Sequence, residues 1–167
     1  IKPYTPLELE GRDLYITNGC NNCHSQMIRP FRSETERYGQ YSKSGEFIYD
    51  RPHLWGSKRT GPDVHRLGGK YLNLWHYRHM EDPHSTSPGS IMPPYAWMLE
   101  RKYDPSYLPA KIRVLQSLGT PYPEDYADVA IDDLNEQAAA IATDLREQGV
   151  EDDELEQRQI VALIAYL

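Results

Sequence analysis

Both cysteines of the chain lie within residues 19–24, a Gly-Cys-Asn-Asn-Cys-His stretch in which a histidine directly follows the second cysteine. This C-x-x-C-H pattern is typical of a covalent haem attachment site. The thiols of Cys20 and Cys23, one helical turn apart, can each add to a vinyl group of the same porphyrin, and His24 is then placed beside the iron as an axial ligand. The motif therefore predicts one haem c bound to this chain.

Three other uses of the cysteine pair have less support. A redox-active dithiol prefers a βαβ context, and nothing after His24 has the pattern of a parallel-sheet unit. A structural zinc ion needs four ligands, and no second cysteine pair follows. A simple disulfide would leave the adjacent histidine unexplained.

Length and composition suit a protein wrapped around a cofactor. The chain has 167 residues, enough to bury a core, and we expect residues 1–167 to form a single domain. It contains thirteen tyrosines but only two phenylalanines, so much of its aromatic surface carries a hydroxyl group that can remain in contact with water. This composition fits a loop-rich protein around a porphyrin ring.

The charge of the chain is unevenly distributed. The formal net charge is −7, which argues against nucleic acid as a partner. Acidic residues are concentrated in residues 124–156, whereas residues 51–80 are rich in Arg, Lys and His. A solvated helix face explains the acidic run, and the half of the chain nearer the haem motif is the more cationic half.

The sequence contains no candidate membrane span. No apolar stretch approaches the roughly 20 residues that a spanning helix needs. The sequence starts at Ile1 rather than at a methionine, which is typical of a processed or excerpted chain. We therefore expect that any membrane anchor or signal segment lies outside these residues.

Capping signals and apolar periodicity predict a mainly α-helical fold. Thr5, Pro6 and Glu8 are placed as an N-cap, a first helical residue and a capping-box partner, so a first helix over residues 6–18 should lead into the cysteine motif. Further helices are expected over residues 70–80, 108–118 and 124–148, the last with or without a break near residue 130, and from about residue 151 to the end. Residues 25–62 should be mostly loop, with one hairpin around residues 43–45.

The sixth ligand of the iron has to come from another part of the chain. A methionine thioether is a soft ligand that raises the reduction potential of haem iron. Of the four methionines, Met92 alone lies in a loop stiffened by prolines. Met27 closely follows His24, Met80 ends a predicted helix, and Met98 lies in an apolar run typical of the core. Met92 is therefore the favoured ligand.

Several stretches of the chain resemble one family. They are residues 10–15, 19–39 (GCNNCHSQMIRPFRSETERYG), 55–63 (WGSKRTGPD), 68–76 (GGKYLNLWH), 92–97 and 161–167. Together they are similar to the monohaem cytochrome c subunit, subunit II, of cbb3-type haem-copper cytochrome c oxidases. The resemblance covers most of the chain except residues 124–156, where it is only general.

The resemblance implies a fold and a set of ligands. The fold would be a class I cytochrome c fold with long loop insertions, in which the first and last helices cross and the face of Gly11 meets that of Leu163. Met92 would be the distal ligand of the iron. The backbone carbonyl of Pro62 would accept a hydrogen bond from Nδ1–H of His24 and so fix the imidazole ring.

The resemblance also implies a function. The haem would relay single electrons from a dihaem cytochrome c subunit to the catalytic subunit, which contains haem b and copper, on the periplasmic side of the cytoplasmic membrane. Membrane association would come from an anchor or a fused partner outside these residues. Because protein groups hold both axial positions, the chain would be a redox subunit with no oxygen chemistry of its own. Arg29, Lys58 and Arg59 are candidates to bind the haem propionates.

Two alternative functions remain open at this point. The chain could be a free periplasmic electron-carrier cytochrome, which would be found in solution rather than in a complex with an oxidase. It could instead bind or sense a small ligand, which would require an open or weakly held sixth position on the iron.

Overall fold

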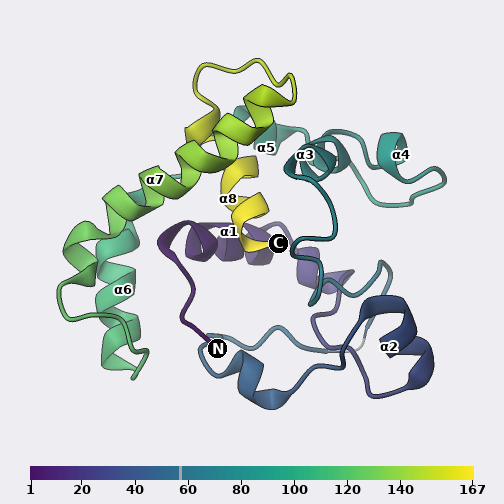
Figure 1. Ribbon diagram of the computed structural model, residues 1–167, viewed down its shortest axis with the longest axis horizontal. Helices are drawn as coiled ribbons and strands as arrows, with labels where there is room; N and C mark the ends of the chain where they lie inside the picture. Colours follow the sequence, from purple (N-terminus) through teal and green to yellow (C-terminus); the bar gives the residue numbers. More distant parts are fainter. Residues whose placement is uncertain (57) are drawn as a thin grey trace.

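Helices joined by long loops make up the fold (Figure 1). The computed structural model describes residues 1–56 and 58–167, so position 57 of the stretch 55–63 lies outside the described residues. The helices are α1 Pro6–Thr17, α2 Arg32–Tyr38, α3 Asn73–Glu81, α4 Pro83–Thr86, α5 Trp97–Glu100, α6 Leu108–Ser117, α7 Tyr126–Glu147 and α8 Gln159–Tyr166, with 3₁₀ helices η1 Cys20–Asn22, η2 Ser44–Phe47, η3 Pro105–Tyr107 and η4 Leu155–Gln157. No strand occurs among the described residues, which confirms the mainly α fold class.

Helix α1 begins at the predicted capping residues. The backbone N–H of Thr5 donates to the Glu8 carboxylate over 2.7 Å. Pro6 occupies the first turn, where a backbone N–H would have no partner within the helix, so its lack of one costs nothing. The chain then turns at Gly19 and enters η1, which starts with Cys20. The end of α1 therefore delivers the cysteine motif, as the sequence predicts.

Helices α1 and α8 cross near the centre of the molecule (Figure 1). Gly11 lies at the crossing, because a Cβ atom built there would be 2.7 Å from the carbonyl carbon of Ala162 and 2.8 Å from Cβ of Tyr166. Beside it the rings of Tyr15 and Tyr166 pack with their centroids 5.4 Å apart. The crossing of the first and last helices, which the family resemblance implied, is therefore present.

Helices α6 and α7 pack together and extend the core beside this crossing (Figure 1). Helix α7 carries an apolar stripe at three- and four-residue spacing whose members are all at most 1% exposed, namely Ala130, Leu134, Ala138, Ala142 and Leu145. The helix is continuous, and residue 130, where the sequence left a break open, is fully buried in it. This stripe is the part of α7 that holds it to α1 and α8.

The prediction of a hairpin around residues 43–45 is wrong. Residues 44–47 form η2, and α2 occupies part of the segment predicted to be loop. Tyr38, which precedes the expected hairpin, ends α2, and Phe47, which follows it, is buried in a stack on the ring of His65 with centroids 4.7 Å apart. Tertiary packing of these aromatic residues outweighs their β-strand propensity.

Helix α8 starts at Gln159, later than the predicted start near residue 151. The acidic residues before it are held in a loop by arginines. Asp152 accepts a hydrogen bond from Nε of Arg158 over 2.7 Å, and Glu156 forms an ion pair with Arg146 at the end of α7. Carboxylates that would suit a helix N-terminus therefore bind side chains of neighbouring elements instead.

Candidate functional site

Residues 20–24 form one tight turn that carries both cysteines and the histidine. The backbone N–H groups of Cys23 and His24 donate to the carbonyl of Cys20 over 3.1 and 2.9 Å. Both cysteines are free thiols, with Cys20 buried and Cys23 exposed. Burial raises the pKa of the Cys20 thiol to about 11, so that it stays protonated at neutral pH.

The ring of His24 is held in a fixed orientation. Its Nδ1–H donates to the backbone carbonyl of Pro62 over 2.8 Å, which is the hydrogen bond that the family resemblance implied. Because Nδ1 carries the proton, Nε2 keeps a free lone pair that can bind a metal. Gly61 lies directly against the ring, since a Cβ atom there would be 2.8 Å from Nδ1 and 2.9 Å from Nε2. Only glycine fits this position without displacing the imidazole.

Backbone hydrogen bonds hold the segment around Pro62 against the cysteine motif. The N–H groups of Thr60 and Gly61 donate to the carbonyl of Cys23 over 3.0 and 2.8 Å. The N–H of Val64 donates to the carbonyl of Ser25 over 3.0 Å. These bonds lie on both sides of His24 in the sequence, so they set the distance between its ring and the Gly61-Pro62 backbone.

Tyrosines of the helix crossing contribute to the same site. The hydroxyl of Tyr15 donates to the carbonyl of His24 over 3.3 Å, and Gln26 donates to the hydroxyl of Tyr166 over 2.8 Å. Burial raises the pKa of Tyr15, which keeps it a neutral donor. No sequence motif indicated these hydrogen bonds; the use of Tyr rather than Phe is the signal that could have indicated them.

Met92 lies in a loop that is fastened beside the end of α1. Its side chain is half-buried and packs against the hydrophobic core. The indole N–H of Trp97 donates to the side-chain oxygen of Asn18 over 3.3 Å, and the N–H of Tyr95 donates to the carbonyl of Met80 over 2.7 Å. The structure thus brings the loop of Met92 close to the segment that leads into the cysteine motif.

Two of the other methionines are buried, and the backbone of Met27 is bound by Asp63 and Arg59. Met98 is fully buried in the core, as the sequence predicts, and Met80 is buried in α3. The N–H of Met27 donates to the Asp63 carboxylate over 2.8 Å, and its carbonyl accepts from Arg59 over 2.8 Å. Met92 therefore remains the predicted ligand among the four.

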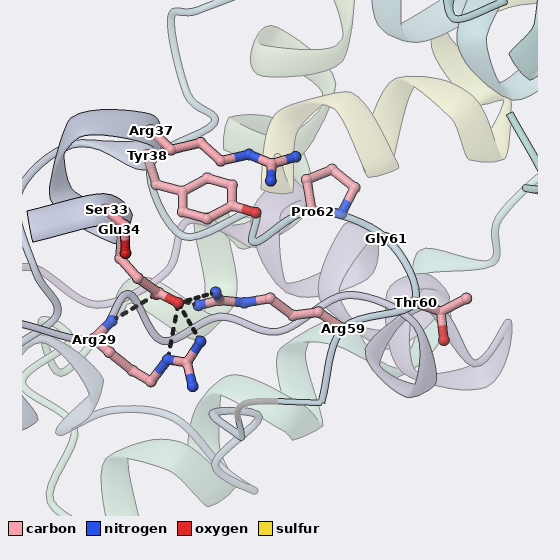
Figure 2. Close-up of a pocket in the computed structure, with 9 residues that line it drawn as sticks. All are labelled: Arg29, Ser33, Glu34, Arg37, Tyr38, Arg59, Thr60, Gly61 and Pro62. Carbon is pink, nitrogen blue, oxygen red and sulfur yellow. Dashed lines mark hydrogen bonds and ion pairs between the residues drawn. The ribbon is translucent and has the colours of Figure 1, made fainter. Parts of the chain in front are cut away.

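Arg59 is the centre of a cluster of hydrogen bonds, of which Figure 2 shows those to Glu34. Its guanidinium donates to Glu34 over 2.7 Å, to the Ser25 hydroxyl over 2.7 Å and to the carbonyl of Met27 over 2.8 Å. The Ser25 hydroxyl donates in turn to Asp63 over 2.6 Å. The cluster ties α2 to the two segments that hold His24.

Glu34 is shared by two of the predicted propionate-binding residues. Its side chain is 7% exposed and also accepts from Nε of Arg29 over 2.8 Å (Figure 2). The hydrogen bonds from Arg59 and Arg29 hold the pKa of Glu34 well below its ordinary value. Lys58, the third candidate, is exposed. No sequence pattern indicated Glu34, because its partners Arg29 and Arg59 lie 5 and 25 residues away, which are not spacings that a helix or strand repeats.

Comparison with known families gives a match along the whole chain. A sequence model of the family described as "Cytochrome C oxidase, mono-heme subunit/FixO" matches residues 1–167. The chain belongs to this family. A comparison with curated proteins found no match. Membership confirms the resemblance drawn from the sequence, and it supports a single haem and an electron-transfer role as a subunit of an oxidase complex.

No helix in residues 1–56 and 58–167 combines the length and apolarity needed to cross a bilayer. In the same residues no group of three or more His, Cys, Asp or Glu side chains could hold a metal ion.

Proposed function

We propose that this chain is the electron-relay subunit of a cbb3-type oxidase, with one haem c attached to Cys20 and Cys23 and its iron bound by His24 and Met92. The observation that carries the proposal is the hydrogen bond from His24 Nδ1 to the Pro62 carbonyl. It fixes the ring tautomer that a metal-binding histidine needs, directly after a pair of free thiols, in a member of a mono-haem family.

The residues present fit this cofactor. Two unbridged thiols can form two thioether bonds, the free Nε2 of His24 supplies one axial ligand, and the half-buried thioether of Met92 supplies the other. A haem bound in this way alternates between ferrous and ferric iron and so carries one electron at a time. Gly61 and Pro62 keep the imidazole of His24 in place, and Tyr15 binds the backbone carbonyl of His24.

The family resemblance supports a direction of electron transfer. Electrons would arrive from a dihaem cytochrome c subunit and leave to the catalytic subunit with haem b and copper, and the chain would carry out no oxygen chemistry. Covalent haem attachment takes place where haem is exported, which assigns the chain to the periplasmic side of the cytoplasmic membrane. A membrane anchor or fused partner outside these residues would hold it there.

A haem propionate would have to share Arg29 and Arg59 with Glu34. Both guanidiniums already bind Glu34. A propionate in the same place would therefore bring a second carboxylate next to a buried one, and it would be held through the spare donors of Arg29, whose side chain is 43% exposed.

Copurification tests the proposed function. The full-length protein, tagged and isolated from mild detergent, should bring with it haem b, copper and a dihaem cytochrome. Recovery of the chain alone, as a coloured protein in the soluble periplasmic fraction, would support the free electron carrier instead. Mass measurement of the denatured chain should show one porphyrin that acid acetone cannot extract.

Replacing Met92 with alanine tests the axial ligand. The variant should lose the sulfur-to-iron absorption of the ferric protein near the red edge of the spectrum and become high-spin or misligated, because the sixth position is opened. The matched control is Met98→Ala, which should cost about 2–5 kcal/mol of stability through a core cavity but leave that absorption in place. If the Met98 change alone removes the absorption, the assignment of Met92 is wrong.

A further inference from the structure

A groove of about 440 Å³ lies between α2 and the segment 59–62 (Figure 2). Its lining includes the three guanidiniums of Arg29, Arg37 and Arg59 and the single carboxylate of Glu34. Most pockets for small organic ligands are enclosed and mainly apolar. This groove is open and polar, which is the character of a surface that meets another charged surface.

The groove carries an uncompensated positive charge. Glu34 is bound by Arg29 and Arg59, so its charge is already matched. Arg37 is different. No carboxylate in the described part of the chain lies within ion-pair distance of it, and its guanidinium rests over the ring of Tyr38, 5.0 Å from the centroid. Arg37 is therefore exposed, partly oriented by the tyrosine and available to a carboxylate from outside.

The charge of the whole chain favours approach of an acidic partner from this side. Residues 1–80 contain twelve Lys or Arg and eight Asp or Glu, whereas residues 81–167 contain six and seventeen. Helix α2 and the acidic helix α7 lie on opposite sides of the molecule (Figure 1). An acidic surface is therefore attracted to the side of the groove and repelled by the side of α7.

The wall of the groove is also the support of the axial histidine. Gly61 and Pro62 line the groove and also contact His24. The Cα of Gly61 lies against the imidazole ring, and the carbonyl of Pro62 accepts its hydrogen bond. No side chain of residue 61 separates the groove from the imidazole ring. A partner seated here would therefore lie against the same two residues that support the imidazole.

We propose that this groove is a docking site for an acidic surface segment of a protein electron-transfer partner, with Arg37 as the residue that binds its carboxylates. The inference deepens the proposed function and rests on it for the identity of the partner as a redox subunit. The groove itself depends only on the charges and contacts described above. Electrostatic complementarity of this kind contributes mainly to association rate and orientation.

A peptide titration tests the groove directly. The purified holoprotein is titrated at low ionic strength with a short polyglutamate peptide, as wild type, as Arg37→Glu and as Arg113→Glu. Arg113 is the matched control, because it is an exposed arginine of α6 on the far side of the molecule whose ion pair, to Asp128, is also exposed. Arg37→Glu should weaken binding about tenfold or more, and Arg113→Glu less than about twofold.

Four results would overturn the proposal. Unchanged affinity in Arg37→Glu would show that the groove does not bind carboxylates. Absence of peptide binding to the wild-type holoprotein, as expected if the groove is filled there, would show the same. An equal loss in both variants would show that only net charge matters. Competition by inorganic phosphate at equal concentration would assign the groove to a small anion rather than to a protein segment. The haem spectrum and melting temperature should be unchanged in both variants, since neither arginine is buried.

Different results would contradict the docking role of the groove and the proposed function. In the intact oxidase, Arg37→Glu should release the chain at a lower salt concentration than wild type or Arg113→Glu, because screening and charge reversal weaken the same contact. A chain that copurifies with no oxidase contradicts the proposed function, and the peptide titration still decides the groove. A chain that copurifies normally, with peptide affinity and salt release unaffected by Arg37→Glu, contradicts the groove alone.

Discussion

Gly61 acts by having no side chain. A methyl group at this position would lie within 2.8 Å of Nδ1 and 2.9 Å of Nε2 of His24, so the ring would have to move off the Pro62 carbonyl. Gly61→Ala should therefore yield less holoprotein, with a shifted Soret band and a lower reduction potential, and should cost about 1–3 kcal/mol or more through overpacking. Optical spectra, potentiometry and chemical unfolding measure these effects.

Gly68 provides the control for this substitution. A Cβ atom there would be 3.7 Å from the carbonyl oxygen of Leu167, which is an ordinary contact. Gly68→Ala should leave the spectrum and the potential unchanged. If Gly61→Ala also left both unchanged, the close approach of Gly61 would have no role in positioning the imidazole.

Glu34 makes stability depend on pH. Hydrogen bonds from Arg59 and Arg29 lower its pKa below the ordinary value of 4.5. Folding therefore favours the ionised form, which stabilises the protein at higher pH, and this contribution is lost as the pH falls below 4.5 toward the lowered pKa. Glu34→Gln should cost about 2–4 kcal/mol at neutral pH, since it leaves the mostly buried Arg59 with only the longer 3.4 Å contact to Asp63, and the cost should shrink in acid.

Urea unfolding of both proteins at neutral and acidic pH measures this difference. Glu36→Gln is the matched control, because Glu36 lies on the same helix but is exposed and pairs only with the exposed Arg32. It should change stability little at any pH. A constant difference between wild type and Glu34→Gln across the pH range would contradict the role assigned to the Glu34 carboxylate.

At the scale of single residues, the sequence predicts what local spacing encodes. Cys20, Cys23 and His24 are adjacent, so their joint role follows from the motif. The His24–Pro62 hydrogen bond joins residues 38 positions apart and was implied only by the family resemblance. The contact between Glu34 and Arg59 joins residues 25 apart with no recurring pattern, so it becomes visible only when the fold brings α2 to the histidine loop.

At the scale of helices, the crossing of α1 and α8 depends on Gly11. In an exposed helix, Gly→Ala would add about 1 kcal/mol of stability through helix propensity. Here the added Cβ would lie 2.7 Å from the carbonyl carbon of Ala162, so the helices would have to separate. Gly11→Ala should therefore destabilise the protein by roughly 2 kcal/mol despite the propensity gain. Thermal and urea unfolding of the holoprotein measure the net effect.

Gly45→Ala is the control for the crossing, because its Cβ would be 3.6 Å from the nearest atom, the side chain of Ile1. This change should be nearly neutral. A stabilising effect of Gly11→Ala would show that α1 and α8 pack less closely than described. Because Tyr15 and Tyr166 of the same crossing bond to His24 and Gln26, the haem spectrum of Gly11→Ala should also shift.

The helices that the sequence predicted well are those with local start signals or long apolar periodicity. Helix α1 has its capping box, and α7 has the buried stripe from residue 130 to residue 145. Helix α2 and the start of α8 were missed for the opposite reason. Arg59 and Arg29 hold α2 in place through Glu34, and Arg158 and Arg146 bind Asp152 and Glu156 ahead of α8, where the chain forms only the short 3₁₀ helix η4. Such tertiary ion pairs leave no periodic pattern in the sequence.

At the scale of the whole molecule, charge separation controls how the chain meets its partner. The groove beside α2 is cationic, and the exposed face of α7 on the opposite side is acidic (Figure 1). The net charge of −7 repels an acidic partner at long range, and the separation of charge turns the groove toward it. The acidic helix would then slow the approach of the partner by long-range repulsion without forming any contact of its own.

Neutralising part of α7 tests this role. Asp132, Glu136 and Glu147 are exposed and have no ion pair in the described part of the chain, so Asp132→Asn, Glu136→Gln and Glu147→Gln together should not affect folding. Removing three carboxylates changes the formal net charge from −7 to −4. The association rate of the holoprotein with the remaining oxidase subunits should rise about two- to threefold at low salt and depend less on ionic strength. Slower association would instead mean that α7 itself docks on a basic surface, and stopped-flow measurements over a range of salt concentrations distinguish the two.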